Sequence, residues 1–359
     1  MMHLLPSSLA PPAAWPGWAD PGLIHGIAAY RRHPWRRSLP DPAVLWQEAD
    51  SRLLDYGKGG GEDAGQTVSA SAARPVLFVP SLVNRAYVLD LLPDRSLVRW
   101  LAAYGVRPLV LDWGWPGAAD RSLALTDLIT GRLERALAAV GSPVVLAGYC
   151  MGGLLALAAA LRRPDLVDAL ALLATPWDFH AVHAEHARRL AAMLPLFEPV
   201  MAATGSLPVD ALQALFAAPD PGAIAAKFRA FGRLEQEGPA ARDFVALEDW
   251  LNDGVPLAAP VARETLGEWY GLNTPGRGTW QVDGVAVEPG RLAMPTFVAA
   301  PARDRIVPPA SALPLARLIP GAVLHQPRAG HIGMVVGPRA EAELWQPLLG
   351  WLQGLRPIM

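Results

Sequence analysis

Residues 144–154, with the sequence VVLAGYCMGGL, decide the fold. A short apolar run typical of a strand buried on both faces leads into Gly-x-Cys-x-Gly, and a run of small residues typical of a helix follows. This order predicts a strained turn between strand and helix, in which side chains at Gly148 and Gly152 would collide with neighbouring backbone. The turn would present Cys150 as a nucleophile at a helix N-terminus, a position that favours the thiolate. The alternative is an inert buried thiol, as most free cysteines are.

The same alternation of strand and helix extends over most of the chain. Short apolar runs predict buried strands at residues 75–80, 107–113, 143–148, 167–174, 295–300 and 322–326. Between them, helix-length stretches cover residues 95–104, 123–140, 154–162, 310–318 and 341–355. This pattern indicates a mostly parallel, doubly wound sheet, and with the Gly-x-Cys-x-Gly turn it predicts an α/β-hydrolase fold.

The alternation stops between residues 177 and 293, where proline, alanine and amphipathic stretches dominate. We expect a helical cap insertion there, over the carboxyl edge of the sheet where ligands of such folds bind. Residues 75–176 and 294–359 would then form the core. Residues 1–74 are expected to form an N-terminal strap, with a short helix near 42–56 and a flexible linker at 57–74. The tryptophans and arginines of the strap leave open a surface-seeking segment instead.

Composition narrows the class of protein. The chain has 359 residues, of which 52% are hydrophobic and 18% charged, and its net charge of −2 gives no field for steering onto nucleic acid. Cys150 is the only cysteine, which excludes an internal disulfide and a cysteine zinc site and favours a reducing, cytoplasmic location. Residues 136–161 are uncharged and long enough to span a bilayer, but their glycines and Pro143 favour a buried core. We expect no transmembrane segment.

A nucleophile needs a base and an acid that orients it. In the predicted fold these follow the nucleophile in the order acid, then histidine, each after a late strand. Asp304 follows the strand at 295–300 and His331 follows the strand at 322–326, so both residues occur where they are required. Taken singly, Asp304 could be a salt-bridged surface residue and His331 a loop histidine. The N–H of Met151 is the expected first donor to an oxyanion.

Two other polar clusters carry weaker signals. His180, His183 and His186 recur every three residues, which drifts around a helix, and no HExxH spacing supports zinc. A carboxylate cluster (Glu248, Asp249 and Asp253) could form a glycosidase-like pair, but a solvated cap helix explains it more simply. No cofactor or metal is expected.

Several motifs beyond the turn are shared with a known family. They are PSLVNRAYVLDL at 80–91, LDWGWP at 111–116, GYCMGG at 148–153, TPWDF at 175–179, DRIVPP at 304–309 and GHIGM at 330–334. On these residues the chain resembles the polyhydroxyalkanoate synthases, and its length and short N-terminus resemble the class III type, the catalytic subunit of a two-subunit enzyme. The resemblance implies Cys150 as nucleophile, Asp304 as acid, His331 as base, and a second oxyanion donor near Val83. One departure is Arg305, where the family usually has histidine.

The resemblance also implies an activity. We expect an acyltransferase that polymerises (R)-3-hydroxyacyl-CoA, with short chains such as 3-hydroxybutyryl, through an acyl-cysteine and with release of CoA. Implied partners are the growing polyester and a second synthase subunit, at the surface of polyester granules. The oligomeric state, including a homodimer, is open. Rival interpretations are a hydrolase of the same fold, either a polyhydroxyalkanoate depolymerase or an acyl-CoA thioesterase, and a non-catalytic granule scaffold.

Overall fold

The computed structural model describes residues 20–57, 74–217 and 221–355. The chain divides into two compact units, Met1–Arg37 with Phe216–Asp249, and Ser38–Leu215 with Trp250–Met359. These bounds differ from those predicted for the strap, the core and the cap at 177–293, which stay a prediction. The predicted linker at 57–74 lies almost wholly outside the described residues, as do Trp15 and Trp18 of the strap.

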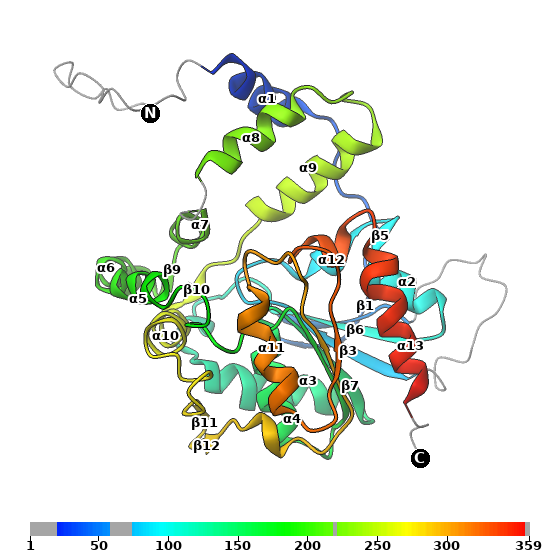
Figure 1. The fold of residues 1–359 in the computed structure, drawn as a ribbon, viewed down its shortest axis with the longest axis vertical. Coiled ribbons are helices and arrows are strands. Elements are labelled where there is room, and N and C mark those ends of the chain that lie inside the picture. Colours follow the sequence, from blue (N-terminus) through cyan, green and yellow to red (C-terminus); the bar gives the residue numbers. More distant parts are fainter. Residues whose placement is uncertain (1–19, 58–73, 218–220, 356–359) are drawn as a thin grey trace. The chain divides into compact units, whose positions relative to one another are not determined.

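An eight-stranded sheet forms the centre of the larger unit (Figure 1). Its strand order is β1-β2-β6-β3-β7-β8-β13-β14, and neighbouring strands from β6 to β14 run parallel. The bounds are β1 Ala43–Glu48, β2 Ser51–Asp55, β3 Pro75–Val79, β6 Arg107–Asp112, β7 Val144–Tyr149, β8 Val167–Leu173, β13 Thr296–Ala299 and β14 Val323–His325. All six predicted strands are present, and the predicted fold class is confirmed.

The predicted helix at 42–56 is wrong, because these residues form the antiparallel hairpin of β1 and β2. Its second strand adds to the sheet antiparallel to β6, with Leu53 opposite Leu111. In β2, Ser51, Leu53 and Asp55 are buried and Arg52 is exposed, which is the period-two pattern of a strand. The sequence SRLLD has no apolar–polar alternation that would reveal this pattern, because two of the three buried residues, Ser51 and Asp55, are polar.

Helices cover both faces of the sheet (Figure 1). Alternate strand residues such as Leu77, Leu146 and Val298 join one core cluster with residues of α4. Phe297, which points the other way, packs its ring 5.4 Å from that of Trp351 in α13. The helices of the sheet are α2 Leu97–Ala103, the π-helix η4 Asp127–Leu133, α3 Glu134–Ala139, α4 Met151–Arg162, α11 Pro309–Leu318, η7 Glu341–Trp345 and α13 Gln346–Gly354.

Residues 136–161 run through α3, β7 and α4, with a strand in the middle. This confirms that the uncharged stretch belongs to the core of the sheet. In the described residues, no helix combines the length and the apolar composition that crossing a membrane requires.

Between β8 and β13 the chain of the larger unit is mainly helical. Its elements there are α5 Ala184–Ala192, α6 Leu194–Thr204, β9 Ser206–Leu207, β10 Leu257–Ala258, α10 Ala259–Arg263, η5 Glu264–Gly271 and the hairpin of β11 Gln281–Val282 and β12 Val285–Ala286. The helices α7 Val209–Ala217 and α9 Pro239–Asn252 each cross from one unit into the other.

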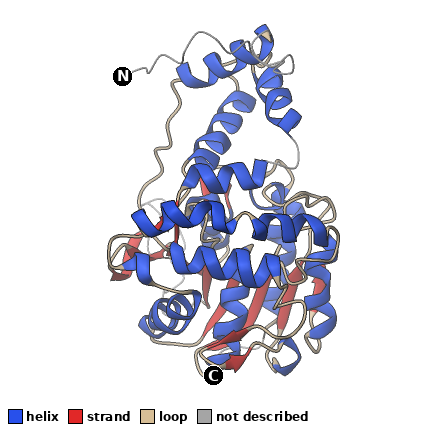
Figure 2. Ribbon diagram, turned by 90° about the vertical axis from the view of Figure 1, so that its left-hand side faces the viewer, coloured by secondary structure: helices blue, strands red, loops and turns tan. Residues whose placement is uncertain are grey.

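The described residues of the smaller unit form helices joined by loops, with no strand among them (Figure 2). It pairs α1 Pro21–Arg32 with α8 Pro221–Phe231 and the greater part of α9. Phe231 and Phe244 stack with ring centroids 4.3 Å apart, and Tyr30 and Trp35 pack against the same cluster. N-terminal residues therefore complete the core of a helix pair that lies about 200 positions later in the chain.

Candidate active site

Cys150 stands at the turn between β7 and α4, and its backbone is in an unusual conformation. Its φ is 55° and its ψ is −129°, a region that side chains other than glycine rarely adopt. Two backbone hydrogen bonds hold the turn, from Cys150 N to Leu173 O at 2.9 Å and from Gly153 N to Cys150 O at 2.9 Å. The strained strand–turn–helix geometry expected of a nucleophile elbow is therefore present.

The glycines of this turn are required by close backbone approach. A Cβ added at Gly148 would lie 2.4 Å from the Cα of Gly153, and one at Gly152 would lie 2.1 Å from the carbonyl oxygen of Val79. Both distances are far below van der Waals contact. The helix α4 can therefore begin directly against the end of β3 only because these positions lack side chains.

Asp304 and His331 meet at the carboxyl end of the sheet, from the loops after β13 and β14. The Nδ1 of His331 lies 2.7 Å from Oδ2 of Asp304, and both side chains are buried. Oδ1 of Asp304 accepts hydrogen bonds from the N–H groups of Ile306 and Val307, each at 2.8 Å. The carboxylate is thus fixed by its own loop and leaves one oxygen to orient the imidazole.

The electrostatics of His331 link it to Cys150. Burial of the ring favours the neutral form, but the charge of the Cys150 thiolate and the hydrogen bond to Asp304 outweigh it. A hydrogen bond to Cys150 acts in the same direction, and together these raise the pKa of His331 from 6.5 to about 10. The structure therefore brings Cys150, His331 and Asp304 together, in an arrangement that favours protonation of the His331 imidazole.

Two tyrosines border these residues. The hydroxyl of Tyr149 donates to the carbonyl oxygen of His331 at 3.3 Å, and its ring centroid lies 5.1 Å from that of His331. Burial, with the charges of Cys150 and Asp304 added, raises the pKa of Tyr149 well above 10. Burial and the charge of Cys150 likewise raise the pKa of Tyr270. Both phenols therefore stay protonated at neutral pH.

The predicted oxyanion donors lie at the start of α4 and in the loop after β3. Met151 is the first residue of α4, so its N–H has no partner within the helix. The N–H of Val83 lies 3.5 Å from Ser81 Oγ, whereas within the described residues the N–H of Leu82 has no acceptor. Trp113 holds the loop from one side by donating from Nε1 to Pro80 O at 3.2 Å.

The remaining predicted candidates take part in other contacts. The Nε2 of His180 lies 2.8 Å from the carbonyl oxygen of Tyr270. Glu248 pairs with Lys227 at 2.7 Å, and Asp249 accepts a hydrogen bond from Tyr30 at 2.7 Å. In residues 20–57, 74–217 and 221–355, no three histidine, cysteine or carboxylate side chains are grouped so that they could hold a metal ion.

Comparison with known families agrees with this geometry. The family model of the alpha/beta hydrolase fold matches residues 74–338, which is most of the chain. The chain belongs to the α/β-hydrolase fold family. Within this family Cys150 occupies the elbow, and Asp304 and His331 follow it in the expected order.

This α/β hydrolase is similar in sequence to poly(3-hydroxyalkanoate) polymerase subunits PhaC. It is 30% identical to that of Haloferax mediterranei over 317 residues, 86% of this chain and 63% of the relative. It is 29% identical to the subunit of Synechocystis sp. over 77% of either chain, and 28% identical to that of Allochromatium vinosum over 77% of this chain and 80% of the other. The resemblance to the polyhydroxyalkanoate synthases is confirmed, although the chain spans less than two thirds of the Haloferax subunit.

Solved structures of more distant α/β hydrolases share the fold. The thioesterase domain from the curacin biosynthetic pathway has a TM-score of 0.52 and 15% identity, covering 88% of this chain and 100% of that one. An esterase from Exiguobacterium antarcticum has a TM-score of 0.52 and 15% identity, covering 85% and 96%. At this identity the similarity shows the fold alone.

Several contacts of this site have no signal in the sequence. Tyr149 precedes Cys150 in the strand, but only the fold brings its hydroxyl to the backbone of a residue 182 positions away. The free N–H of Leu82 likewise depends on the path of the loop after β3. Arg305, where the family pattern has histidine, is exposed, whereas Asp304 beside it is buried. That departure therefore leaves the contact between Asp304 and His331 in place.

Proposed function

We propose that this α/β hydrolase is an acyltransferase that polymerises (R)-3-hydroxyacyl-CoA into polyester through an acyl-cysteine at Cys150. The observation that carries the proposal is the arrangement of Cys150, His331 and Asp304 on a strained elbow, in a chain similar to PhaC polymerase subunits. Cysteine suits this chemistry because transfer from CoA to Cys150 exchanges one thioester for another. The acyl group on Cys150 then remains activated for the next attack.

In the first step His331 takes the proton of the Cys150 thiol, and the thiolate attacks the carbonyl carbon of the hydroxyacyl thioester. Asp304 stabilises the protonated imidazole, and the N–H groups of Met151 and the residues 82–83 donate to the oxyanion. The bond from the acyl carbon to the CoA sulfur then breaks, and the departing thiolate takes the proton from His331. Free CoA leaves and the acyl group stays on Cys150.

In the second step the 3-hydroxyl of another hydroxyacyl-CoA attacks the acyl-cysteine. His331 accepts the hydroxyl proton, an ester bond forms, and the bond to the Cys150 sulfur breaks. Cys150 then recovers its proton from His331. The chain has a single cysteine. Attack by the hydroxyl lengthens the polyester without the need for a second cysteine in the same chain.

Water at the acyl-cysteine would end the chain, so exclusion of water separates a polymerase from a hydrolase of the same fold. We propose that the predicted cap at 177–293 serves this purpose. The second subunit, a homodimer and a location at polyester granules belong to the same proposal, and they rest on the family resemblance alone. A depolymerase or thioesterase would release the free hydroxy acid instead.

The acyl-cysteine can be tested by rapid quenching of the protein with (R)-3-hydroxybutyryl-CoA and peptide mass mapping. We expect an acyl adduct on the peptide that contains Cys150, and a larger share of adduct when hydroxyl acceptors are scarce. An adduct on another residue, or CoA release without any adduct in wild type and in His331→Gln, would contradict the proposed intermediate. A non-catalytic scaffold would show neither adduct nor CoA release.

A further inference from the structure

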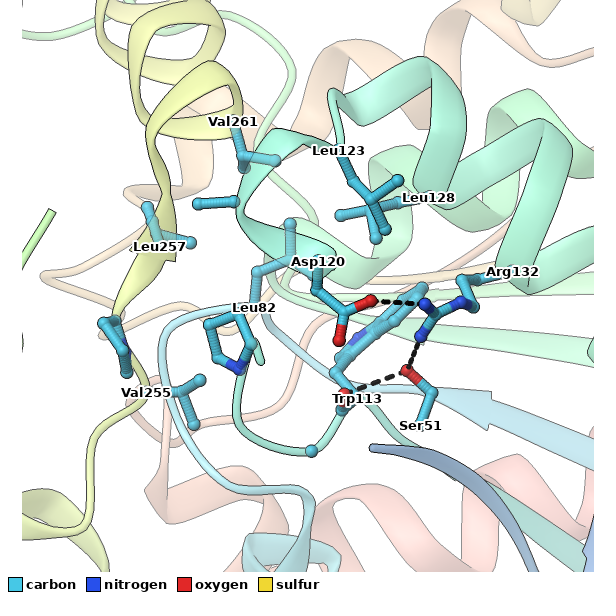
Figure 3. A pocket seen from close by; sticks show the side chains of 14 residues that line it. Ser51, Leu82, Trp113, Asp120, Leu123, Leu128, Arg132, Val255, Leu257 and Val261 are labelled. Carbon is cyan, nitrogen blue, oxygen red and sulfur yellow. Dashed lines mark hydrogen bonds and ion pairs between the residues drawn. The ribbon is translucent and has the colours of Figure 1, made fainter. Parts of the chain in front are cut away.

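A pocket outside the reacting residues opens beside the loop that follows β3 (Figure 3). It is partly open to solvent and lies wholly within the larger unit. Most of its wall is aliphatic, and the side chains that form it come from the loop, from the start of η4 and from residues 255–261. The aliphatic residues of the lining include Leu82, Leu123, Leu128, Val255, Leu257 and Val261.

The charged residues of the pocket wall are already matched to one another. Arg132 pairs with Asp120 and donates from Nη1 to Ser51 Oγ at 2.8 Å (Figure 3). It also donates from Nε to Glu48 at 2.9 Å. All three nitrogens of the guanidinium therefore have partners within the protein. A pocket with compensated charges and aliphatic walls suits an uncharged apolar group and offers no site for phosphate.

The loop at 80–83 lies between this pocket and the nucleophile helix. On one side, the Cβ of a residue at 152 would be 2.4 Å from Pro80 O, so α4 touches the loop directly. On the other side, Leu82 lines the pocket and Val255 N donates to Val83 O at 3.0 Å. An acyl carbonyl held at the N–H groups of Met151 and Leu82 would thus have the pocket next to it.

We propose that this pocket binds the aliphatic substituent of the hydroxyacyl group and sets the acyl-chain length that the enzyme accepts. The inference rests on the proposed function, because it assigns a subsite to the substrate of that reaction. Each methylene that fits or fails to fit an apolar pocket changes transition-state binding, so the pocket volume should appear directly in substrate preference.

Leu128 allows the pocket to be altered in both directions, since it is half-buried in η4 and points into the pocket (Figure 3). We would measure kcat/KM from CoA release with (R)-3-hydroxybutyryl-CoA and (R)-3-hydroxyoctanoyl-CoA. Leu128→Trp fills the pocket and should lower the octanoyl-to-butyryl ratio about tenfold or more, whereas Leu128→Ala should raise it. A ratio that moves less than about twofold in both variants would overturn the inference.

Matched controls are Val285→Trp and Val285→Ala. Val285 lines a second cavity with Ala158 and Arg162, on the β11–β12 hairpin, away from the reacting residues. These variants should leave the ratio unchanged. Thermal midpoints of all four variants show whether each is folded, and the opposite effects of the two Leu128 variants separate a pocket effect from loss of stability.

A binding measurement distinguishes failure of the inference from failure of the proposed function. In a Cys150→Ala background no acyl transfer can occur, and ligand binding raises the thermal midpoint. We expect hydroxyoctanoyl-CoA to raise it more than hydroxybutyryl-CoA, and Leu128→Trp to abolish the difference. If these midpoint shifts are observed but the wild type releases no CoA, the pocket is retained and the polymerase is rejected. A wild type that releases CoA but shows no chain-length effect in either measurement would retain the polymerase and reject the pocket.

Discussion

At the scale of single residues, Cys150, His331 and Asp304 were all predicted from the chain order of an elbow and two loops. The structure brings the three side chains together because each follows a strand of the sheet, and parallel strands bring their carboxyl ends to one edge. Their catalytic roles stay a prediction. The oxyanion donor was harder to place. The role of Val83 stays a prediction: its N–H lies 3.5 Å from Ser81 Oγ, and that of Leu82 has no acceptor among the described residues. The path of the loop decides which of these N–H groups is available.

The first prediction concerns the nucleophile. Cys150→Ala should lower CoA release about 10³-fold or more, because no other cysteine can take the acyl group. Cys150→Ser should retain only a small activity, since a hydroxyl is less readily deprotonated than a thiol. Initial rates of CoA release measure both variants, and wild-type turnover in Cys150→Ala would reject the assignment.

The second prediction concerns pH. The pKa of His331 is raised from 6.5 to about 10, so its protonated ring stabilises the folded state fully below pH 6.5. That stabilisation is lost as the pH rises through about 10. Cys150→Ala removes one of the groups that raise this pKa, so the variant should lose the stabilisation at a lower pH than the wild type. Thermal midpoints measured across this pH range test the prediction. Parallel curves of midpoint against pH for the two proteins would contradict a contribution of Cys150 to the pKa of His331.

At the scale of elements, the strands were predictable because continuous apolar runs are needed where both faces of a sheet are covered. The hairpin of β1 and β2 was not predicted, and a helix was expected in its place. It lies at the edge of the sheet, where β1 is largely exposed, and the apolar run at residues 43–46 is too short to distinguish a strand from a helix. Part of its position is set by the pairing of Glu48 with Arg132, a contact between residues 84 positions apart that no local pattern reveals.

The third prediction tests how closely α4 must approach β3. Gly152→Ala places a Cβ 2.1 Å from Val79 O and 2.4 Å from Pro80 O, so it should destabilise the protein by about 3 kcal/mol or more. Gly350→Ala is the matched control, because that glycine is exposed in α13 with no atom within 4 Å of the added Cβ. It should stabilise the protein by up to about 1 kcal/mol. Denaturant unfolding of both variants compares the two effects, and equal stabilities would show that the approach is not required.

At the scale of the whole molecule, the division into two units was not predictable from composition. The smaller unit joins N-terminal residues to α8 and α9, and its contacts, such as the hydrogen bond from Tyr30 to Asp249, span 219 positions. Helical periodicity indicates an apolar face but not which distant helix covers it. The strap was expected to pack, yet its partner could be found only in the structure.

The fourth prediction concerns that unit. The Cβ of Gly26→Ala would lie 1.9 Å from Phe228 O, so this substitution should separate α1 from α8. We expect faster amide hydrogen exchange in residues 20–37 and 221–249, with β7 and α4 unchanged. Gly22→Ala serves as control on the same helix, because its Cβ meets only side-chain atoms, of Arg229 and Asp20, at 3.3 Å or more. Unchanged exchange in Gly26→Ala would show that the unit does not depend on this contact.

The central claim is that the acyl group on Cys150 passes to a hydroxyl and not to water. The most direct test incubates the protein with (R)-3-hydroxybutyryl-CoA, alone and with a candidate second subunit, and follows CoA release and insoluble polyester together. The account predicts both products in proportion, and neither with Cys150→Ala. Release of CoA with only free 3-hydroxybutyrate would contradict it and identify a hydrolase.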